Sequence, residues 1–372
     1  MEKISFARLF DGIEPIYDEI INKIKEIINN TAFIGGEEVS LFEKEFAEFT
    51  ESKYAIGTAN GTDSIIIALK ALGIGTGDTV LVPATTFIAT ADAVTAVGAN
   101  VEFIDIEKDY YTMDPDKIIE YLKGPNGHKV KAIIPVHLYG QMADMERISQ
   151  IAKEYNLKVI EDAAQAHGSK LNGHQPGYYS DIATYSFYPG KNLGAFGDAG
   201  AITTNNEELY NKCKMLVNHG RLKEKYTHEI EGFNMRLDTI QAAILRIKLR
   251  HLSEWTSLRK QKASIYIEML KNKDNIQYPK IRKNAEPVWH IFSILIDNRD
   301  AVKEDLFKNG IETGIHYPIP LHLQPAYKYK NYKQGDFPNA EYHASHELSL
   351  PFWAEITKEN ISKVITKLSN QI

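Results

Sequence analysis

Short apolar runs alternate with amphipathic stretches through the first half of the chain. The apolar runs have the length and the Val, Ile and Phe content of buried strands, and the amphipathic stretches repeat apolar residues at helical spacing. Strands that alternate with helices form mainly parallel sheets, so the sequence predicts an α/β fold with a mainly parallel central sheet. We expect strands at 54–60, 79–83, 101–106, 132–136, 158–162 and 182–187, and helices from residue 61, over 115–123 and over 143–155.

The second half of the sequence predicts a smaller α+β domain. A helical pattern extends from Thr239 to about Leu270, and we place the boundary near Arg250 within it. This gives a large domain over residues 1–250, which includes two N-terminal helices, and a C-terminal domain over residues 251–372. In the C-terminal domain we expect strands at 289–296 and 311–317, a helix at 300–309 and closing helices after residues 340 and 357. A chain of 372 residues, 43% of them hydrophobic, is long enough for more than one core.

One lysine follows a predicted strand in a glycine-rich run. Lys191 lies between Gly190 and Gly194, directly after the strand at 182–187, with Tyr188 and Phe196 close to it in sequence. Most lysines are exposed, so an ordinary surface turn is the competing interpretation. A lysine that its neighbours partly desolvate loses its charge more easily, and its amine is then a nucleophile that forms Schiff bases.

An aspartate ends the strand before it. The apolar run that includes Val159 and Ile160 stops at Asp162. Because ligand sites in open α/β sheets lie at the carboxyl ends of the strands, we expect Asp162 and Lys191 at one edge of the sheet. Pyridoxal phosphate (PLP) needs both groups, since a carboxylate keeps its ring nitrogen protonated while a lysine binds it covalently. The pair therefore indicates a PLP site.

Around these residues the sequence resembles the DegT/DnrJ/EryC1/StrS sugar aminotransferases, which have the aspartate aminotransferase fold (fold type I of PLP enzymes). The resemblance extends over nearly the whole chain. It implies that Lys191 holds PLP and acts as the catalytic base, that Asp162 binds the ring nitrogen and that Gln165 binds the phenolic oxygen. It also implies that Phe87 covers one ring face, although core packing is the competing role for this phenylalanine. Pyridoxamine phosphate is the form expected during turnover.

The cofactor phosphate is expected at the beginning of a helix. Gly61 and Thr62 follow the strand at 54–60. Free backbone N–H groups and the helix dipole favour an anion at such a position. Thr62 or Asp63 is also expected to cap this helix, and both roles are compatible. The resemblance adds Ser186 to the phosphate contacts.

A second subunit is also implied by the resemblance. The run Gly-x-Asn-x-Arg-x-Asp at 232–238 is similar to the family segment that crosses the dimer interface. Asn234 is accordingly expected to reach the PLP phosphate of the neighbouring subunit. We therefore expect a homodimer with shared active sites.

The resemblance also narrows the substrate. The segment from Tyr188 to Gly194 is most similar to that of the aminotransferases that act at C-3 of dTDP-linked 3-keto-6-deoxyhexoses. The resemblance implies L-glutamate as the amino donor. A C-4 or cyclitol aminotransferase is the alternative, and a PLP-dependent sugar dehydratase is less consistent, because the resembling C-3 dehydratase has histidine in place of Lys191. The residues expected to contact the sugar are Gly35, His167, Tyr188, Arg236, His316, Tyr317 and His322.

The composition of the chain indicates which partners and which cellular compartment to expect. The net charge of −6 comes from interspersed signs, which does not favour a nucleic-acid surface. The single cysteine, Cys213, excludes an internal disulfide and suits a reducing compartment. Residues 1–20 do not have a signal-peptide pattern and no apolar run reaches membrane-spanning length, so a cytoplasmic protein without membrane contact is expected. No metal site is expected, and His343 and His346 are expected to be solvated.

Overall fold

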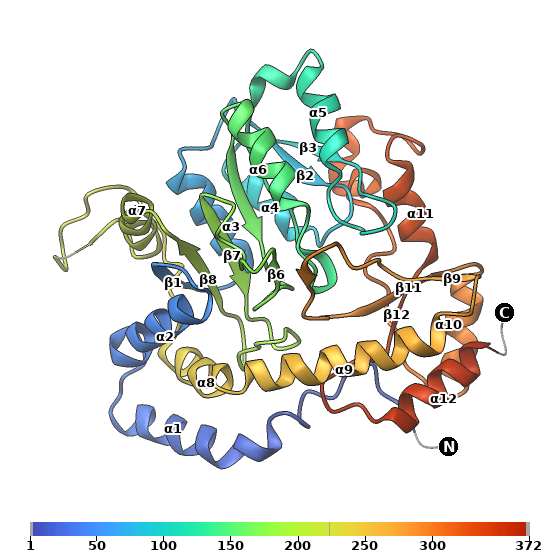
Figure 1. Cartoon of the computed structure of the whole chain (residues 1–372). Coiled ribbons are helices and arrows are strands. Elements are labelled where there is room, and N and C mark those ends of the chain that lie inside the picture. The colour runs from blue at the N-terminus through green and yellow to red at the C-terminus, as the bar shows by residue number, and fades with distance from the viewer. Residues whose placement is uncertain (1–2, 223, 370–372) are drawn as a thin grey trace.

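The computed structural model describes residues 3–222 and 224–369. Its centre is a seven-stranded sheet with the strand order β1-β8-β7-β5-β4-β2-β3 (Figure 1). Only β8 is antiparallel to its neighbours, so the prediction of a mainly parallel sheet is confirmed. The strands are β1 Tyr54–Thr58, β2 Thr79–Pro83, β3 Asn100–Ile104, β4 Val130–Ile133, β5 Lys158–Asp162, β7 Ile182–Ser186 and β8 Gly200–Thr204.

Helices cover both faces of this sheet, which is why its strands are apolar in nearly every position. Along β7, Ile182 faces one core and Ala183 faces the other, as the two-residue period of a strand requires. One face packs against α3 Gly61–Ala71, α4 Ala89–Ala96 and α7 Glu207–Val217. The other packs against α2 Gly36–Phe49, α5 Pro115–Lys123, α6 Met145–Glu154 and α8 Thr239–Leu249. Helix α1 Tyr17–Asn29 packs on α8.

A second, three-stranded sheet in the order β12-β11-β9 forms a separate core. Its strands are β9 Ile276–Gln277, β11 Phe292–Ile296 and β12 Glu347–Leu350, and its helices are α9 Leu252–Leu270, α10 Arg299–Lys308 and α12 Lys358–Ser369. Figure 1 shows α9 as one long helix that extends from α8 to α12. We propose the domain boundary at the break between α8 and α9, at Arg250. The N-terminal segment also belongs with this second core, because Ile4 pairs with Ile311.

The C-terminal part differs from the prediction in two places. The strand expected at 311–317 is absent, and only Ile311 and Gly314 make isolated pairs there. The N–H of His316 instead binds the Glu347 carboxylate, so it does not enter a ladder. Strand β12 was not predicted, since it contains the polar residues Glu347 and Ser349, yet both are fully buried.

Helix α11, Pro338–His346, accounts for a further correction. His343 was expected to be solvated but is 1% exposed, because its ring packs against the rings of Tyr111 and Tyr139. The buried Asp105, just after β3, accepts hydrogen bonds from the N–H groups of Asn339 (3.1 Å) and Ala340 (2.9 Å). The first turn of α11 is therefore fixed to the large sheet.

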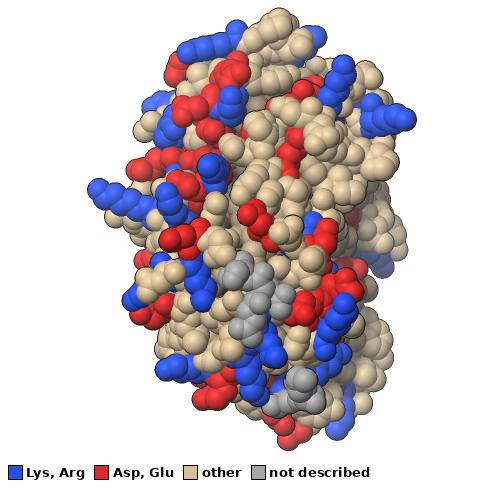
Figure 2. Space-filling model, turned by 90° about the vertical axis from the view of Figure 1, so that its right-hand side faces the viewer, with Lys and Arg blue, Asp and Glu red and all other residues tan. Residues whose placement is uncertain are grey.

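The surface has no large area of one charge on the face shown in Figure 2, where acidic and basic side chains are interspersed. In residues 3–222 and 224–369, no helix is both long enough and apolar enough to cross a membrane.

Candidate active site

The ends of β5 and β7 bring the two principal predicted residues together. The strands are parallel neighbours, and Asp162 pairs with Thr184. Lys191 follows β7 in the loop that leads to β8, and its charge interacts with that of Asp162. The expected convergence of an acid and an amine at the carboxyl edge of the sheet is present in the structure.

Asp162 is held by two donors. Its Oδ2 accepts a 2.8 Å hydrogen bond from Thr90 Oγ1, and its Oδ1 accepts a 3.1 Å bond from the N–H of Ala164. Only 6% of the residue is exposed. Because both carboxylate oxygens accept a hydrogen bond, the orientation of the group is fixed before any ligand binds.

Lys191 is partly exposed and lies in a tightly held loop. Its N–H donates a 2.8 Å hydrogen bond to the carbonyl of Tyr188. The neighbouring Asn192 is buried, donates to the carbonyl of Val288 at 3.1 Å and contacts His290 Nδ1 at 3.1 Å. The surrounding protein atoms exclude water and lower the pKa of the Lys191 ammonium to about 8, against the opposing effect of Asp162. About a tenth of the amine is therefore uncharged at pH 7, against far less for an ordinary lysine.

The beginning of α3 lies against the end of β7. A Cβ built on Gly61 would lie 2.7 Å from Cβ and 3.2 Å from Oγ of Ser186. The helix is capped by Asn60, whose side chain accepts a 2.8 Å hydrogen bond from the N–H of Asp63, so the prediction of a cap at Thr62 or Asp63 is wrong. Free N–H groups of the first helical turn thus lie next to the Ser186 hydroxyl, and this combination of donors suits an anion.

Phe87 lies at the exit of β2 with 56% of its surface exposed, which excludes the competing role of a core phenylalanine. Its ring centroid lies 5.7 Å from that of Tyr317. Gln165 is nearby, since its side chain hydrogen-bonds to Tyr317. Its Oε1 accepts a 2.7 Å bond from the N–H of Tyr139, so its amide NH2 group is the donor on the side of Tyr317.

Two predicted sugar contacts do not fit the structure. His167 is 0% exposed and packs against the rings of Tyr185 and Phe187, while its Nε2 donates to the carbonyl of Ser186 at 3.0 Å. Burial, with a smaller effect of Lys191, lowers its pKa to about 3. A side chain without exposed surface does not reach a substrate, so we assign His167 to the support of Ser186.

His322 is the second of these residues. It is 2% exposed and lies 3.0 Å from Glu341, on α11. Glu341 also accepts hydrogen bonds from the N–H groups of Gly335 and Phe337. The sequence pattern could not distinguish this anchoring role from a ligand contact, because both favour a histidine in a proline-rich loop.

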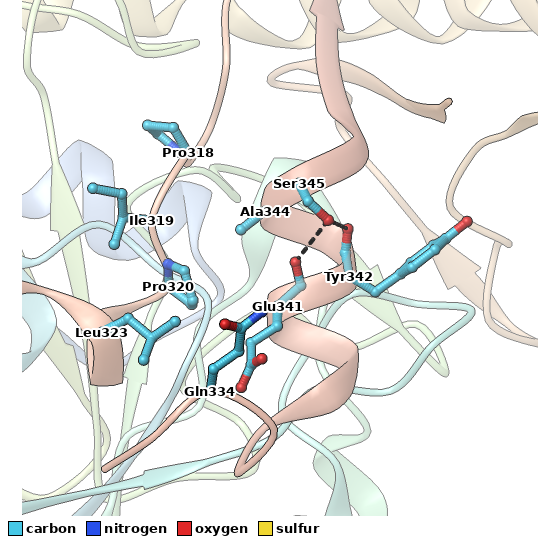
Figure 3. Close-up of a pocket in the computed structure, with 9 residues that line it drawn as sticks. All are labelled: Pro318, Ile319, Pro320, Leu323, Gln334, Glu341, Tyr342, Ala344 and Ser345. Carbon is cyan, nitrogen blue, oxygen red and sulfur yellow. Dashed lines mark hydrogen bonds between the residues drawn. The ribbon is translucent and has the colours of Figure 1, made fainter. Parts of the chain in front are cut away.

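A cavity of about 390 Å³ lies between this loop and α11 (Figure 3). Apolar residues of the loop face residues of α11 across it. The lining residues are Pro318, Ile319, Pro320, Leu323, Gln334, Glu341, Tyr342, Ala344 and Ser345. Together with the His322–Glu341 contact, this arrangement shows that the segment after Tyr317 is attached to α11.

The other predicted sugar contacts lie around the Lys191 loop or on neighbouring segments. Tyr188 is 60% exposed beside Lys191, and His316 is close enough to Lys191 for the lysine charge to add to burial in lowering the pKa of the imidazole to about 4. Gly35 accepts a 2.9 Å bond from Thr239 Oγ1. Arg236 donates to Asn218 Oδ1 at 2.9 Å.

Asn234 is exposed and belongs to a segment that runs beside the end of β1. The carbonyl of Met235 accepts a 3.0 Å hydrogen bond from the N–H of Ala59, and Arg236 pairs with Thr58. This places the segment next to the beginning of α3. Within the described chain, no hydrogen bond of the Asn234 side chain ties it to Lys191.

Sequence reasoning missed several residues that shape this site. Thr90 binds Asp162, and Asn192, His290 and Tyr139 fix the loops that carry Lys191 and Gln165. The signal for Thr90 was weak, since it lies in the first turn of α4, seven residues after β2 ends at Pro83. Among residues 3–222 and 224–369, no cluster of three or more His, Cys, Asp or Glu side chains is arranged to hold a metal ion.

Comparison with known proteins decides the family. The sequence profile of the DegT/DnrJ/EryC1/StrS aminotransferase family matches residues 15–369. The chain belongs to this family. It is a PLP-dependent sugar aminotransferase, as the resemblance had indicated.

Three relatives illustrate the range within the family. The chain is 43% identical to a pleiotropic regulatory protein of Geobacillus stearothermophilus, covering 97% of this chain and 96% of the relative. It is 43% identical to a dTDP-3-amino-3,6-dideoxy-alpha-D-galactopyranose transaminase of Aneurinibacillus thermoaerophilus, covering 93% of each. It is 42% identical to a UDP-N-acetyl-3-dehydro-alpha-D-glucosamine 3-aminotransferase of Acidithiobacillus ferrooxidans, covering 95% of this chain and 93% of the relative.

Solved structures have the same fold. The S. venezuelae protein DesV, crystallised with a ketimine intermediate, superposes with a TM-score of 0.96 at 38% identity and covers 100% of this chain and 99% of that one. A Bacillus subtilis protein with bound cofactor PMP superposes with a TM-score of 0.91 at 36% identity, covering 100% of this chain and 85% of that one.

The residues present fit PLP. The N-terminus of α3 approaches Ser186 as closely as a glycine at position 61 allows, which places backbone N–H donors and the Ser186 hydroxyl side by side, as a phosphate requires. Asp162 is a buried, fixed carboxylate that suits a protonated ring nitrogen. Phe87 offers an exposed ring face, and the amide NH2 group of Gln165 has two N–H donors, one more than its contact with Tyr317 uses, which suits a phenolic oxygen.

Proposed function

We propose that this protein transfers the amino group of L-glutamate to C-3 of a dTDP-linked 3-keto-6-deoxyhexose. The observation that carries the aminotransferase chemistry is Lys191, with its lowered pKa, beside the fixed carboxylate of Asp162. The choice of C-3 is supported by two relatives at 42–43% identity, whose names both specify position 3 although their nucleotides differ.

We assign the cofactor contacts as follows. Asp162 binds the ring nitrogen, Gln165 the phenolic oxygen, and Phe87 one ring face. The N–H groups at Gly61 and Thr62 and the Ser186 hydroxyl bind the phosphate. The carboxylate of Asp162 is well suited because its two fixed hydrogen bonds leave it no freedom to turn away.

We also propose that the protein is a homodimer. Asn234 of one subunit would then complete the phosphate site of the other, which agrees with its exposure in the single chain and with the absence of a link to its own Lys191.

Lys191 has two tasks in this proposal. It would hold the cofactor, and its Nζ, when free, would accept a proton from the α-carbon of the amino donor. Bound PLP supplies the electron sink that makes this carbon acidic. A pKa near 8 lets Nζ take and return the proton close to neutral pH.

The sugar would bind on the exposed side of the Lys191 loop. Tyr188 and Tyr317 offer hydroxyl groups there, and His316 offers a ring nitrogen. Gly35 and Arg236 are retained as contacts of the sugar nucleotide, whereas His167 and His322 are not.

Parallel assays with three keto-sugars test this proposal. The purified protein with PLP and L-glutamate is given dTDP-linked 3-keto-6-deoxyhexose, the 4-keto isomer and a UDP-linked 3-keto sugar in parallel. We expect 2-oxoglutarate formation to be fastest with the first substrate and NMR of the product to place the amine at C-3. Amination at C-4 would contradict the proposal. A preference for the UDP-linked sugar would show that the proposed nucleotide is wrong and that the proposed C-3 position is right.

A further inference from the structure

We propose that Glu347 and Ser349 are positioning residues that hold His316 as the Nδ1–H tautomer, so that its Nε2 is a hydrogen-bond acceptor in the active site. The two residues lie on β12, outside the PLP site, and neither contacts Lys191. They act through His316, which lies directly before Tyr317 and the proline-rich loop.

The three side chains form a continuous chain of short hydrogen bonds. Ser349 Oγ lies 2.6 Å from Glu347 Oε1 and 2.8 Å from His316 Nδ1. Glu347 Oε2 lies 2.6 Å from the backbone nitrogen of His316. Glu347 and Ser349 are both 0% exposed, so water does not compete for these bonds.

The direction of the hydrogen bonds follows from the carboxylate. An ionised carboxylate only accepts, so Ser349 must use its single proton to donate to Glu347. The lone pairs of the hydroxyl are then available to His316, and Nδ1 must carry the proton that bridges to Oγ. A neutral imidazole with the proton on Nδ1 has an unprotonated Nε2.

The backbone and the ring plane of His316 are both held, and the Ser349 contact selects the side on which Nδ1 lies. Its N–H donates to Glu347, its carbonyl accepts a hydrogen bond from the Tyr139 hydroxyl, and its ring stacks on Phe6 with centroids 5.7 Å apart. Tyr139 is itself 3.2 Å from Nε2 of the buried His343. Among the described residues, none forms a hydrogen bond with Nε2 of His316, which leaves this atom for a ligand.

The groups around Glu347 determine the pH at which its carboxylate is ionised and can accept the Ser349 proton. Burial raises the pKa of the Glu347 carboxyl to about 7, although Ser349, the His316 N–H and Arg299 of α10 oppose this effect. The remaining titratable neighbours are Tyr111, Tyr139 and Tyr317, whose raised pKa values keep them neutral. At pH 8 the carboxyl is therefore mostly ionised, while His316, with a pKa of about 4, is neutral.

An acceptor beside Lys191 suits a hydroxyl group of the bound sugar, and this part of the inference rests on the proposed function. The tautomer itself does not. It is a property of the resting protein and is measurable without any sugar.

The test is two-bond ¹H–¹⁵N NMR of the holoenzyme at pH 8, with ¹⁵N-labelled histidine and the His316 signals assigned by their loss in His316→Gln. Unprotonated Nε2 couples to both ring protons, whereas unprotonated Nδ1 couples strongly to only one of them. We expect the unprotonated nitrogen of His316 to be Nε2. An unprotonated Nδ1 in the wild-type protein would overturn the proposal without further variants.

Two variants test the relay. In Glu347→Gln, the amide NH2 donates to Ser349, whose proton turns to His316 Nδ1, so we expect the tautomer to switch to Nε2–H. Ser349→Ala removes the acceptor, and we expect the Nδ1–H form to lose its dominance. The matched controls are Glu341→Gln, which changes a different histidine–carboxylate contact, and Ser169→Ala, which removes another buried hydroxyl. Both should leave the His316 signals unchanged.

Kinetics distinguish positioning from loss of structure. For the sugar that the protein accepts best, we expect kcat/KM in Glu347→Gln to fall about tenfold, the loss of one hydrogen bond. The visible spectrum of bound PLP and the unfolding midpoint should remain close to wild type. An unchanged tautomer in both relay variants would refute the proposal, whereas failure to aminate any sugar with the predicted tautomer intact would count only against the proposed function.

Discussion

Gly61 at the beginning of α3 lies directly against Ser186 at the end of β7, so that a β-carbon on the glycine would be 2.7 Å from that of the serine. Real Cβ atoms do not approach this closely, and the backbone at one side or the other would have to shift. The close approach of this helix N-terminus to the end of β7 therefore depends on residue 61 having no side chain. An anion held there would be fixed relative to Lys191.

Gly61→Ala should weaken PLP binding. The added methyl group would collide with Ser186 and shift the serine and the helix N-terminus that we assign to the cofactor phosphate. We expect the dissociation constant of PLP, measured by equilibrium dialysis, to rise about tenfold or more. Gly75→Ala is the control, because the nearest atom to its new methyl group would be 3.5 Å away and outside the site. Equal affinities in the two variants would remove Gly61 from the phosphate site.

Thr90→Val should lower the rate more than the stability. The valine keeps the shape of the side chain but removes the 2.8 Å hydrogen bond to Asp162 Oδ2. Loss of a hydrogen bond to a carboxylate corresponds to about 2 kcal/mol, so kcat/KM should fall by a factor of about 10–30. Thr90→Ser retains the hydroxyl group and should recover most of the activity. A serine variant as slow as the valine variant would show that packing, not the hydrogen bond, is what Thr90 supplies.

Asn234 and Lys191 should complement each other across subunits. If the proposed dimer shares its sites, refolding a mixture of Lys191→Ala and Asn234→Ala chains produces hybrids with one complete site. Random pairing would restore about a quarter of the wild-type sites. Activity of the mixture should exceed the sum of the two separate variants. A mixture no more active than that sum, with dimer exchange confirmed by mass spectrometry, would place Asn234 outside the partner's site.

The principal features could be predicted because they depend on residues that are close in sequence. The alternation of strands and helices gave the central sheet, and Asp162 and Lys191 each follow a strand that the pattern identifies clearly. Parallel strands then bring their carboxyl ends to one edge. Phe87 was also placed at a strand exit, although only the structure could exclude core packing for it.

What could not be predicted depends on long-range contacts. Thr90 meets Asp162 across 72 positions of sequence. From the sequence, Glu347 and Ser349 are expected to be solvated. In the structure both are buried on β12 and form hydrogen bonds with His316. His167 failed as a sugar contact for a related reason, because its contacts with Tyr185 and Phe187, which bury it, are 18 or more positions away in the sequence.

Lys248 should make stability depend on pH. This lysine is 7% exposed on α8 and donates to the carbonyl of Gly194, and burial lowers its pKa to about 8. In the unfolded chain its pKa is about 10.4, so between these values the unfolded state binds more protons. The free energy of unfolding should therefore rise with pH from about 8 to about 10.4. In urea titrations of the holoenzyme, Lys248→Met should lack this increment, and an identical slope in both proteins would contradict the burial of a neutral amine.

The central claim is that Lys191, rather than another buried lysine, holds the cofactor. Lys191 and Lys248 both have a pKa lowered to about 8, but only Lys191 interacts with Asp162 at the edge of the sheet. The most direct measurement is borohydride reduction of the PLP-loaded protein followed by peptide mass mapping. We expect a pyridoxyl group on Lys191 and no label on that peptide when L-glutamate is added before reduction. A label on Lys248, or none on Lys191, would contradict it.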